Sequence, residues 1–325
     1  MTITLAGGIT LFGITVAPPP SENTAAWFGG GTAPGFRSTV ARITFATDTA
    51  TASVRGPLSL ARRRLAAAGN LTDGWFGGGY ASGNRSTVDR ITYATDTATA
   101  SVRGPLSLAR YGLAAAGNTT DAWFGGGYND NAQPYNKSTV DRITYATDTA
   151  TASVRGTLSY PAGTSLSAAA GNETDGWFGG GNAGGVPGLS AVERITYATD
   201  TATASIRGPL SVSRRTNLGA AGNTTNAWFG GGSGISTGPG YTSTVDRITY
   251  ATDTATASVR GPLSSAISYM AAAGNSTDGW FGGGAYSGGV SIVQRITYAT
   301  DTAATSTRGP LSAAIYELAA AGGIQ

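Results

Sequence analysis

Two charged residue types recur at fixed spacing in this chain and could do chemistry. An Arg begins each RIT sequence, a second Arg follows 13 residues later, and an Asp lies between them in the segment ATDTA. The six sets could form a ring of sites. The chain has no His and no Cys, which removes the usual general base, the thiol nucleophile and the two commonest transition-metal ligands. We therefore expect no catalytic residue, metal or cofactor, and interpret the Arg and Asp residues as structural pairs and turn caps.

Two further patterns have both a functional and a structural interpretation. The sequence WFGGG could suggest a phosphate-binding loop, but no helix and no Lys follow it, so we interpret the glycines as close packing. Asn-x-Thr is formally a glycosylation acceptor, but Asn followed by Thr is also ordinary turn chemistry, which we favour. These asparagines are Asn70, Asn118, Asn172, Asn223 and Asn275.

All of these patterns belong to one unit of about 50 residues that recurs six times. Every Trp begins a WFGGG sequence, at Trp27, Trp75, Trp123, Trp177, Trp228 and Trp280. The RIT sequences begin at Arg42, Arg90, Arg142, Arg194, Arg247 and Arg295. A third sequence, A-A-G, ends at Gly69, Gly117, Gly171, Gly222, Gly274 and Gly322. The repeats fill the chain.

Each unit predicts four short antiparallel strands. Thr, Val, Ile and aromatic residues alternate with a period of two, and Gly, Asn, Asp and Pro separate the runs. In the second unit we expect strands at 65–69, 74–78, 87–95 and 97–103. The first is almost only Ala and Gly, which suits a position where strands crowd around an axis. We therefore predict an all-β fold, a six-bladed β-propeller of four-stranded antiparallel blades.

The two ends of the chain predict how the ring closes. The first copy begins at its second strand, and a surplus A-A-G strand at 318–323 follows the sixth copy. The C-terminal strand is therefore expected to complete blade one. We place an N-terminal arm at 1–24 and the propeller at 25–325. Blades are expected near 25–56 with 316–325, 64–104, 112–156, 165–208, 217–261 and 269–309.

The strand order resembles the kelch repeat. A small-residue strand precedes an aromatic strand ending in Gly-Gly (Trp123 to Gly126), then a strand ending in Tyr145 and Asp148, then a strand with Pro-Leu and Arg. The kelch pattern carries its Trp on the fourth strand, where this chain has Ala100 to Val102. Kelch-type propellers serve as binding platforms and occasionally as enzymes. The repeats also resemble propeller proteins of bacteriophages, especially those of cyanobacteria, which implies a protein of the extracellular virion.

Length variation among the copies marks one face of the disc. The step from Trp to RIT varies from 15 to 19 residues and the step from R-G to the next Trp from 20 to 22. In an antiparallel blade, the loop between strands two and three and the connection from strand four to the next blade emerge on the same side. We call this side the variable face. Its 2–3 loops are 32–38, 80–86, 128–138, 182–190, 233–243 and 285–291.

The variable face is rich in Arg and Tyr, which suit a glycan or polyanionic ligand. Aromatic rings stack on sugars, and Arg pairs with carboxylate, sulfate or phosphate. Nine basic residues assigned to this face against Asp130 and Glu317 predict a local charge of +7, whereas the whole chain carries +3. The predicted ligand-binding residues are Arg37, Arg62, Arg63, Arg64, Tyr80, Arg85, Arg110, Tyr128, Tyr135, Lys137, Arg214, Arg215, Tyr241 and Tyr286.

Three functions follow from these observations. The first is a non-enzymatic adhesin of a phage tail or tail fibre that recognises a host surface polysaccharide or receptor. The second is a structural virion component, such as a capsid decoration or a tail or baseplate connector, with Met1 to Pro20 as an arm that adds a strand to a partner. The third is a glycan-cleaving enzyme, which would need paired carboxylates where the variable face offers few acids.

Membrane and nucleic-acid partners are not expected. The longest weakly polar stretch, 3–17, is too short and too rich in Thr and Gly to span a bilayer. No basic residue precedes it, so it does not resemble a secretory signal. Host glycans or receptors and other virion proteins are the expected partners.

Overall fold

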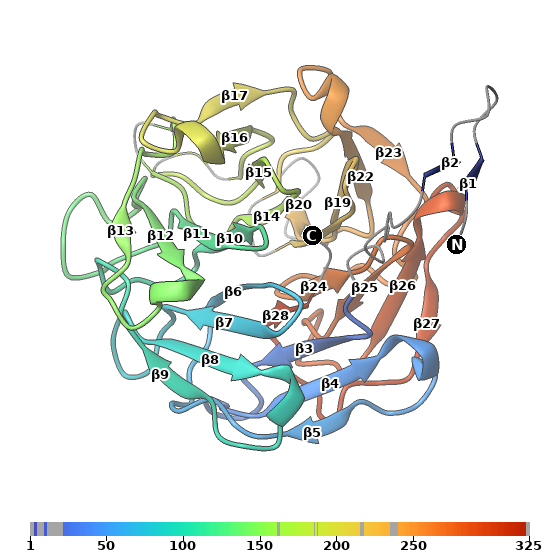
Figure 1. Ribbon diagram of the computed structural model, residues 1–325, viewed down its shortest axis with the longest axis horizontal. Coiled ribbons are helices and arrows are strands. Elements are labelled where there is room, and N and C mark those ends of the chain that lie inside the picture. The colour runs from blue at the N-terminus through green and yellow to red at the C-terminus, as the bar shows by residue number, and fades with distance from the viewer. Residues whose placement is uncertain are drawn as a thin grey trace.

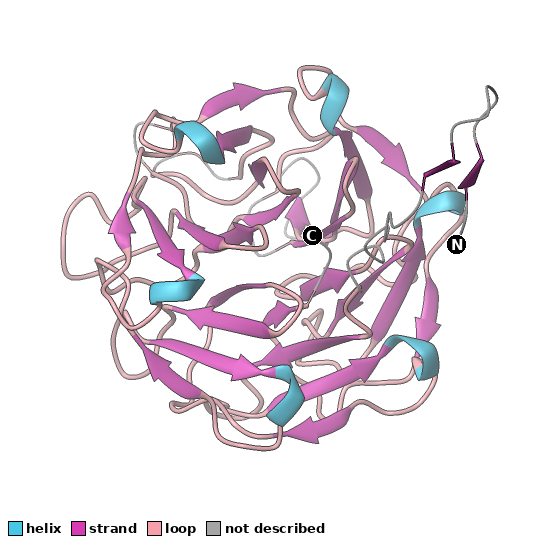
Figure 2. Ribbon diagram, in the orientation of Figure 1, coloured by secondary structure: helices cyan, strands magenta, loops and turns pink. Residues whose placement is uncertain are grey.

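The computed structural model describes residues 22–160, 163–184, 186, 188–214, 218–234 and 240–322, with two short strands before them. The described residues form six four-stranded antiparallel sheets arranged in a ring around an axis (Figures 1 and 2). The fold is therefore the predicted six-bladed β-propeller. The two early strands, β1 (Ile3–Thr4) and β2 (Thr10–Leu11), pair with each other in a sheet of their own, and the rest of the predicted arm before residue 22 lies outside the described residues.

Each blade runs outward from the axis in chain order, apart from the closing strand. The innermost strands are β28 (Ala319–Ala321), β6 (Ala66–Gly69), β10 (Ala114–Gly117), β14 (Ala168–Gly171), β18 (Gly219–Gly222) and β24 (Ala271–Gly274). The second strands are β3 (Ala25–Gly29), β7 (Asp73–Gly77), β11 (Asp121–Gly125), β15 (Asp175–Gly179), β19 (Asn226–Gly230) and β25 (Asp278–Gly282). The third strands are β4 (Val40–Thr44), β8 (Val88–Thr92), β12 (Val140–Thr144), β16 (Val192–Thr196), β22 (Val245–Thr249) and β26 (Val293–Thr297). The outermost strands are β5 (Ser53–Arg55), β9 (Ser101–Arg103), β13 (Ser153–Val154), β17 (Ser205–Arg207), β23 (Ser258–Arg260) and β27 (Ser306–Arg308).

The ring closes through the two ends of the repeat region. Strand β28 pairs antiparallel with β3, so that Ala319 lies opposite Gly29 and Ala321 opposite Trp27. Blade one is therefore completed by the C-terminal strand, as predicted. This pairing removes the edge that an open ring would leave beside β3.

The third strand is shorter than the sequence pattern predicted. In the second unit β8 ends at Thr92, and the next three residues form a 3-10 turn, η2 (Tyr93–Thr95), before β9 begins at Ser101. The equivalent turns are η1 (Phe45–Thr47), η3 (Tyr145–Thr147), η4 (Tyr197–Thr199), η5 (Tyr250–Thr252) and η6 (Tyr298–Thr300). They are the helical elements of the described chain, and none could cross a membrane. The turn replaces an extended strand because it aims Tyr93 and Asp96 at the preceding blade.

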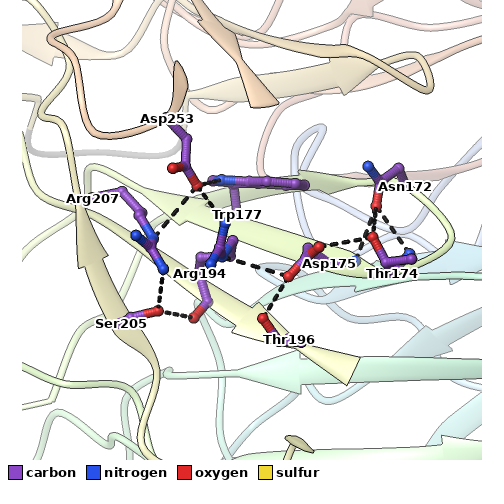
Figure 3. A network of polar contacts seen from close by, with 9 residues as sticks. All are labelled: Asn172, Thr174, Asp175, Trp177, Arg194, Thr196, Ser205, Arg207 and Asp253. Carbon is purple, nitrogen blue, oxygen red and sulfur yellow. Dashed lines mark hydrogen bonds and ion pairs between the residues drawn. The ribbon is translucent and has the colours of Figure 1, made fainter. Parts of the chain in front are cut away.

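The Asp of each ATDTA segment binds three side chains of the preceding blade. Asp253 accepts a hydrogen bond from Trp177 Nε1 at 2.8 Å, and its carboxylate lies 3.1 Å from Arg194 and 3.4 Å from Arg207 (Figure 3). The same contact occurs at all six junctions, including the closing one. The Trp–Asp pairs are Trp27–Asp96, Trp75–Asp148, Trp123–Asp200, Trp177–Asp253, Trp228–Asp301 and Trp280–Asp48. The repeated Arg and Asp residues are therefore structural pairs, as interpreted from the sequence.

The apolar core lies between the blades rather than within them. Each Trp stacks on the aromatic residue that opens the 3-10 turn of the next blade, with ring centroids 3.7–3.9 Å apart. One of six buried clusters joins Trp75 of blade two to Phe124, Ile143 and Tyr145 of blade three. Burial raises the pKa of the Tyr145 phenol well above its usual value, so the ring stays neutral in the interface.

Glycine permits two of the close contacts between blades. Gly56 donates its N–H to Asp96 O at 2.7 Å, and a Cβ on Gly56 would lie 1.8 Å from Ala98 O. In WFGGG the last two glycines have positive φ, for example 68° at Gly78 and 108° at Gly79. Gly79 donates to Arg110 O at 2.9 Å. The glycines therefore serve blade packing, as interpreted from the sequence.

The Asn-x-Thr sequences form turns that close the first two strands. Asn172 Oδ1 accepts hydrogen bonds from the N–H groups of Thr174 and Asp175, both at 2.9 Å (Figure 3). Its side-chain amide donates to Thr224 O of the next blade at 3.4 Å. The turn interpretation is confirmed, and the same residues also link neighbouring blades on the face opposite the variable one.

We predict that Asp148→Ala destabilises the fold by about 2–3 kcal/mol, because it leaves Trp75 Nε1, Arg90 and Arg103 without their shared acceptor. Urea unfolding followed by Trp fluorescence measures this. The control is Asp130→Ala in an exposed loop position, which should change stability by less than about 0.5 kcal/mol. Equal effects of the two substitutions would contradict the role assigned to Asp148.

Candidate ligand-binding face

The 2–3 loops and the connections between blades lie against one another on the variable face. Backbone bridges join Arg63 to Tyr80 and Tyr111 to Tyr128, each pairing a connection with the neighbouring 2–3 loop. Equivalent bridges join Thr32 to Tyr316 and Ser268 to Ala285. The two segment types that vary in length thus form one continuous surface, because a backbone bridge joins each connection to the loop beside it.

A row of aromatic rings crosses this surface from blade one to blade three. The centroid distances are 6.0 Å from Phe36 to Tyr80, 5.4 Å from Tyr80 to Tyr111, 5.4 Å from Tyr111 to Tyr128 and 5.7 Å from Tyr128 to Tyr135. We call these five residues the aromatic strip. Phe36 and Tyr135 are exposed, and the three rings between them are half-buried. Phe36 and Tyr80, and Tyr80 and Tyr111, meet edge to face at interplanar angles of 78° and 81°, so the row offers ring faces, ring edges and hydroxyl groups together.

Two arginines are held against the aromatic strip. The guanidinium carbon of Arg63 lies 5.4 Å from the Phe36 centroid and 5.6 Å from that of Tyr80. That of Arg64 lies 5.7 Å from the Tyr111 centroid. Both arginines pair with the buried Glu317, at 3.0 Å from Arg63 Nη1 and 2.5 Å from Arg64 Nε. Because Glu317 anchors both arginines and is shared between them, the cluster keeps a net positive charge at the surface.

Where the chain enters the innermost strands around the axis, five connections of the described chain share an unusual backbone conformation at one residue. This residue lies two positions before the innermost strand, and its φ is 54° at Arg64, 66° at Gly112, 61° at Leu166, 58° at Tyr269 and 59° at Glu317. Successive residues of this kind are joined by backbone hydrogen bonds, for example from Arg64 N to Glu317 O at 2.8 Å and from Gly112 N to Arg64 O at 2.7 Å. Left-handed conformations cost non-glycine residues about 1–2 kcal/mol each. The backbone hydrogen bonds between these residues offset this cost and hold Arg64 and Glu317 beside the aromatic strip.

Three predicted ligand residues are not on the surface. Arg62, Arg110 and Arg214 are fully buried and pair with the equally buried Asp89, Asp141 and Asp246 at 2.7, 2.8 and 2.6 Å. Each guanidinium also donates to backbone carbonyls of the second strand; Arg62 donates to Phe76 O at 2.9 Å and to Gly78 O at 2.8 Å. The prediction of surface ligands at these positions was wrong, because the connection turns the side chains inward, where they bind the carboxylate and the backbone carbonyls.

This burial lowers the charge of the variable face. Asp89, Asp141 and Asp246 neutralise three of the counted arginines, and Arg215 lies outside the described residues. The described cations that remain are Arg37, Arg63, Arg64, Arg85 and Lys137, against Asp130 and Glu317. Among the described residues the local charge is therefore +3, which is lower than the predicted +7 chiefly because three arginines are buried in ion pairs. Burial also lowers the pKa of Arg110 from its usual value, and the neighbouring Asp141 opposes that shift.

The other predicted residues lie on the loops themselves. Arg37 donates from Nε to Ala33 O at 2.6 Å, Arg85 donates to Ala81 O, and Lys137 donates to Ala132 O at 2.8 Å, so each closes its own loop. Tyr80, Tyr128 and Tyr135 belong to the aromatic strip. Tyr241 and Tyr286 are exposed, but among the described residues neither has a ring contact that would place it in the strip.

Four residues around Arg64 were missed at the level of sequence, namely Tyr111, Glu317, Tyr269, whose centroid lies 5.9 Å from the Arg64 guanidinium carbon, and Tyr316, whose centroid lies 6.4 Å from that of Tyr269. Tyr111, Tyr269 and Tyr316 lie in connections between blades, whereas the prediction took its tyrosines from the 2–3 loops. Glu317 was counted only as an opposing charge. A signal for them was present, because each lies just before an innermost strand in a segment whose residue types differ among the copies.

The described residues hold no group of three His, Cys, Asp or Glu side chains that could bind a metal ion. No family model matches this chain, and no curated protein matches it in sequence. In fold the chain is similar to the solved structure of YjhT, with a TM-score of 0.70 over 89% of this chain and 95% of that chain. The two are 15% identical, so the similarity shows the propeller fold alone.

We predict that Asp89→Ala destabilises the protein by about 3–5 kcal/mol, because it leaves the buried Arg62 without its carboxylate. The double substitution Asp89→Ala with Arg62→Ile copies blade one, where Ala41 and Ile315 occupy the equivalent positions. It removes the unpaired charge and should recover more than half of the lost stability in urea unfolding. A double variant as unstable as the single one would show that the buried charge is not the cause.

Proposed function

We propose that this protein is a non-enzymatic binding module whose variable face recognises a surface polysaccharide or a receptor. The observation that carries the proposal is the aromatic strip with Arg63 and Arg64 held against it. The exposed rings of Phe36 and Tyr135 can stack on the apolar faces of sugars, and the hydroxyl groups of Tyr80 and Tyr128 between them can pair with sugar hydroxyls. Arg63 and Arg64 favour glycans that carry carboxylate, sulfate or phosphate groups.

Preorganisation supports the same proposal. The backbone under the aromatic strip is tied by the bridges Arg63–Tyr80 and Tyr111–Tyr128, and Glu317 fixes both arginines. A ligand would therefore bind side chains that have already lost much of their conformational freedom, which lowers the entropic cost of binding. Loops carried by a rigid scaffold are the usual place for such specificity.

The proposed setting is the extracellular virion of a bacteriophage, on the tail or a tail fibre. It rests on the resemblance of the near-identical repeats to phage propeller proteins. The partners in that setting are a host surface glycan or receptor and other virion proteins, without nucleic acid and without membrane insertion. A scaffold whose repeated contacts lie between blades can vary its loops independently, which suits a surface that must follow changing hosts.

A structural role in the virion is the second candidate. The observation that favours it is the antiparallel pair β1 and β2, which precedes the propeller and forms a sheet separate from all six blades. A segment of this kind can add a strand to a neighbouring subunit. Deleting residues 1–20 distinguishes the two candidates, since an adhesin would keep its binding to host polysaccharide and a connector would lose its place in the particle.

We predict that the purified protein binds extracted host surface polysaccharide, and that Tyr80→Ala with Tyr128→Ala weakens the affinity about tenfold or more. Raising NaCl from about 0.05 to about 0.5 M should weaken binding to an acidic polysaccharide, because salt screens Arg63 and Arg64. Biolayer interferometry on immobilised glycan measures both effects.

The matched control is Tyr241→Ala, which removes an exposed Tyr of the blade-five loop. It should leave the affinity within about twofold of the unchanged protein, since Tyr241 lies outside the aromatic strip. Circular dichroism and urea unfolding verify that both variants fold. Equal losses in the two variants, or no binding to any host glycan at low salt, would refute the proposed role of the strip.

A further inference from the structure

Blade one contains a pocket where blade two contains a buried arginine. The pocket has a volume of about 230 Å³ and a floor of Phe28, Ala41, Leu311, Ile315 and Leu318. In blade two the guanidinium of Arg62 occupies the equivalent place. All five floor residues are almost fully buried, and the side chain of Arg37 lies at the rim.

The pocket arises from three shortened side chains. In an alignment of the repeats, Ala41 is equivalent to Asp89, Ile315 to Arg62 and Ala313 to Leu60. The remaining pocket residues, such as Phe28 and Leu318, have the same type as their counterparts in blade two. In every other blade the third strand carries a polar side chain at the position of Ala41, namely Asp89, Asp141, Glu193, Asp246 or Gln294.

Those polar side chains bind groups of the connection that leads into their blade. Glu193 accepts from Tyr160 N at 2.9 Å, and Gln294 Oε1 accepts from Ser264 Oγ at 2.8 Å. In blade one Ala41 and Ile315 leave neither a polar group nor enough volume to fill the space. The result is an apolar hollow where blades two, three and five carry a buried ion pair.

Arg37 gives the rim of this pocket a fixed positive charge. Its Nε donates to Ala33 O at 2.6 Å, which orients the guanidinium, and within the described chain it has no ion pair with a carboxylate. Thr39 and Ser312 add hydroxyl groups to the lining. An apolar floor below a guanidinium that has no ion pair in the described chain suits a ligand with an apolar body and one anionic group.

We propose that the blade-one pocket binds a small aryl carboxylate, with its ring on the floor of Phe28, Ile315 and Leu318 and its carboxylate on Arg37. An apolar cavity of about 150 Å³ already accepts benzene, so about 230 Å³ accommodates one ring and a short carboxylated side chain. This site is independent of the proposed glycan role, because it uses the apolar interior of blade one and none of the rings of the aromatic strip. The two sites share only a loop, in which Arg37 follows Phe36.

The test uses phenylacetate and its neutral counterpart phenylacetamide as probes, with binding followed by ligand-observed NMR on the full chain. Phenylacetate should bind with a dissociation constant of about 1 mM or lower, as expected for a ligand of ten heavy atoms. Arg37→Gln should weaken the affinity for phenylacetate about three- to tenfold and the affinity for phenylacetamide by less than about twofold. Arg85→Gln is the equivalent change in blade two. It should alter neither affinity, because Arg62 fills the equivalent space in that blade.

A second set of variants fills the pocket. Ala41→Asp with Ile315→Arg transplants the buried pair of blade two and should abolish binding of both probes. Ala313→Leu, at the exposed rim, restores the bulk of Leu60 without placing a charge in the interior and should weaken binding if the double variant fails to fold. The proposal is overturned if phenylacetate does not bind the unchanged protein, if the filled variants bind it equally, or if Arg37→Gln has no effect on it.

Discussion

The junction between neighbouring blades is the contact on which the rest of this structure depends. At each junction one Asp carboxylate accepts from a Trp indole and faces two arginines of the preceding blade, while an aromatic ring beside it covers the Trp. No single unit can make this contact, because its Trp and Arg donors lie on one side of the blade and its Asp acceptor on the other. Each unit therefore needs a neighbour on both sides, and only a closed ring satisfies all six carboxylates.

This arrangement leaves the two faces of the disc with different freedom. On one face the Asn turns and the 3-10 turns contact the adjacent blade, so their length and sequence are constrained. On the variable face the connections add short backbone bridges to the 2–3 loops and otherwise differ in length. The buried positions under this face also differ in a coupled way. Where the third strand has Asp89, the connection supplies Arg62, and where it has Ala41, the connection supplies Ile315. In these two blades charge is kept or lost as a pair, because an unpaired buried ion is costly, whereas the buried Glu193 of blade four is held by the N–H groups of Ser159 and Tyr160.

The asymmetry of the variable face comes from this local substitution within a symmetric frame. The aromatic strip occupies blades one to three, and its arginines depend on Glu317, which belongs to the connection that closes the ring. The pocket of blade one arises beside that same closing connection. Ring closure therefore joins residues from the two ends of the chain into one surface, and the unusual residues of the last repeat lie next to those of the first.

The amino-acid sequence was sufficient for the architecture, because six near-identical units with period-two strands and a small-residue innermost strand are compatible with few folds. It also sufficed to assign Trp, Gly-Gly-Gly and Asn-x-Thr to packing and turns, since local geometry decides those roles. The chain order could not reveal that Arg62 is buried while its neighbours Arg63 and Arg64 lie at the surface. The burial of each side chain depends on which way the connection turns against the second strand. Nor could the chain order reveal that Tyr111 lies between Tyr80 and Tyr128, or that Glu317 binds arginines more than 250 positions away. Those contacts join residues of different blades, and they exist only once the ring has closed.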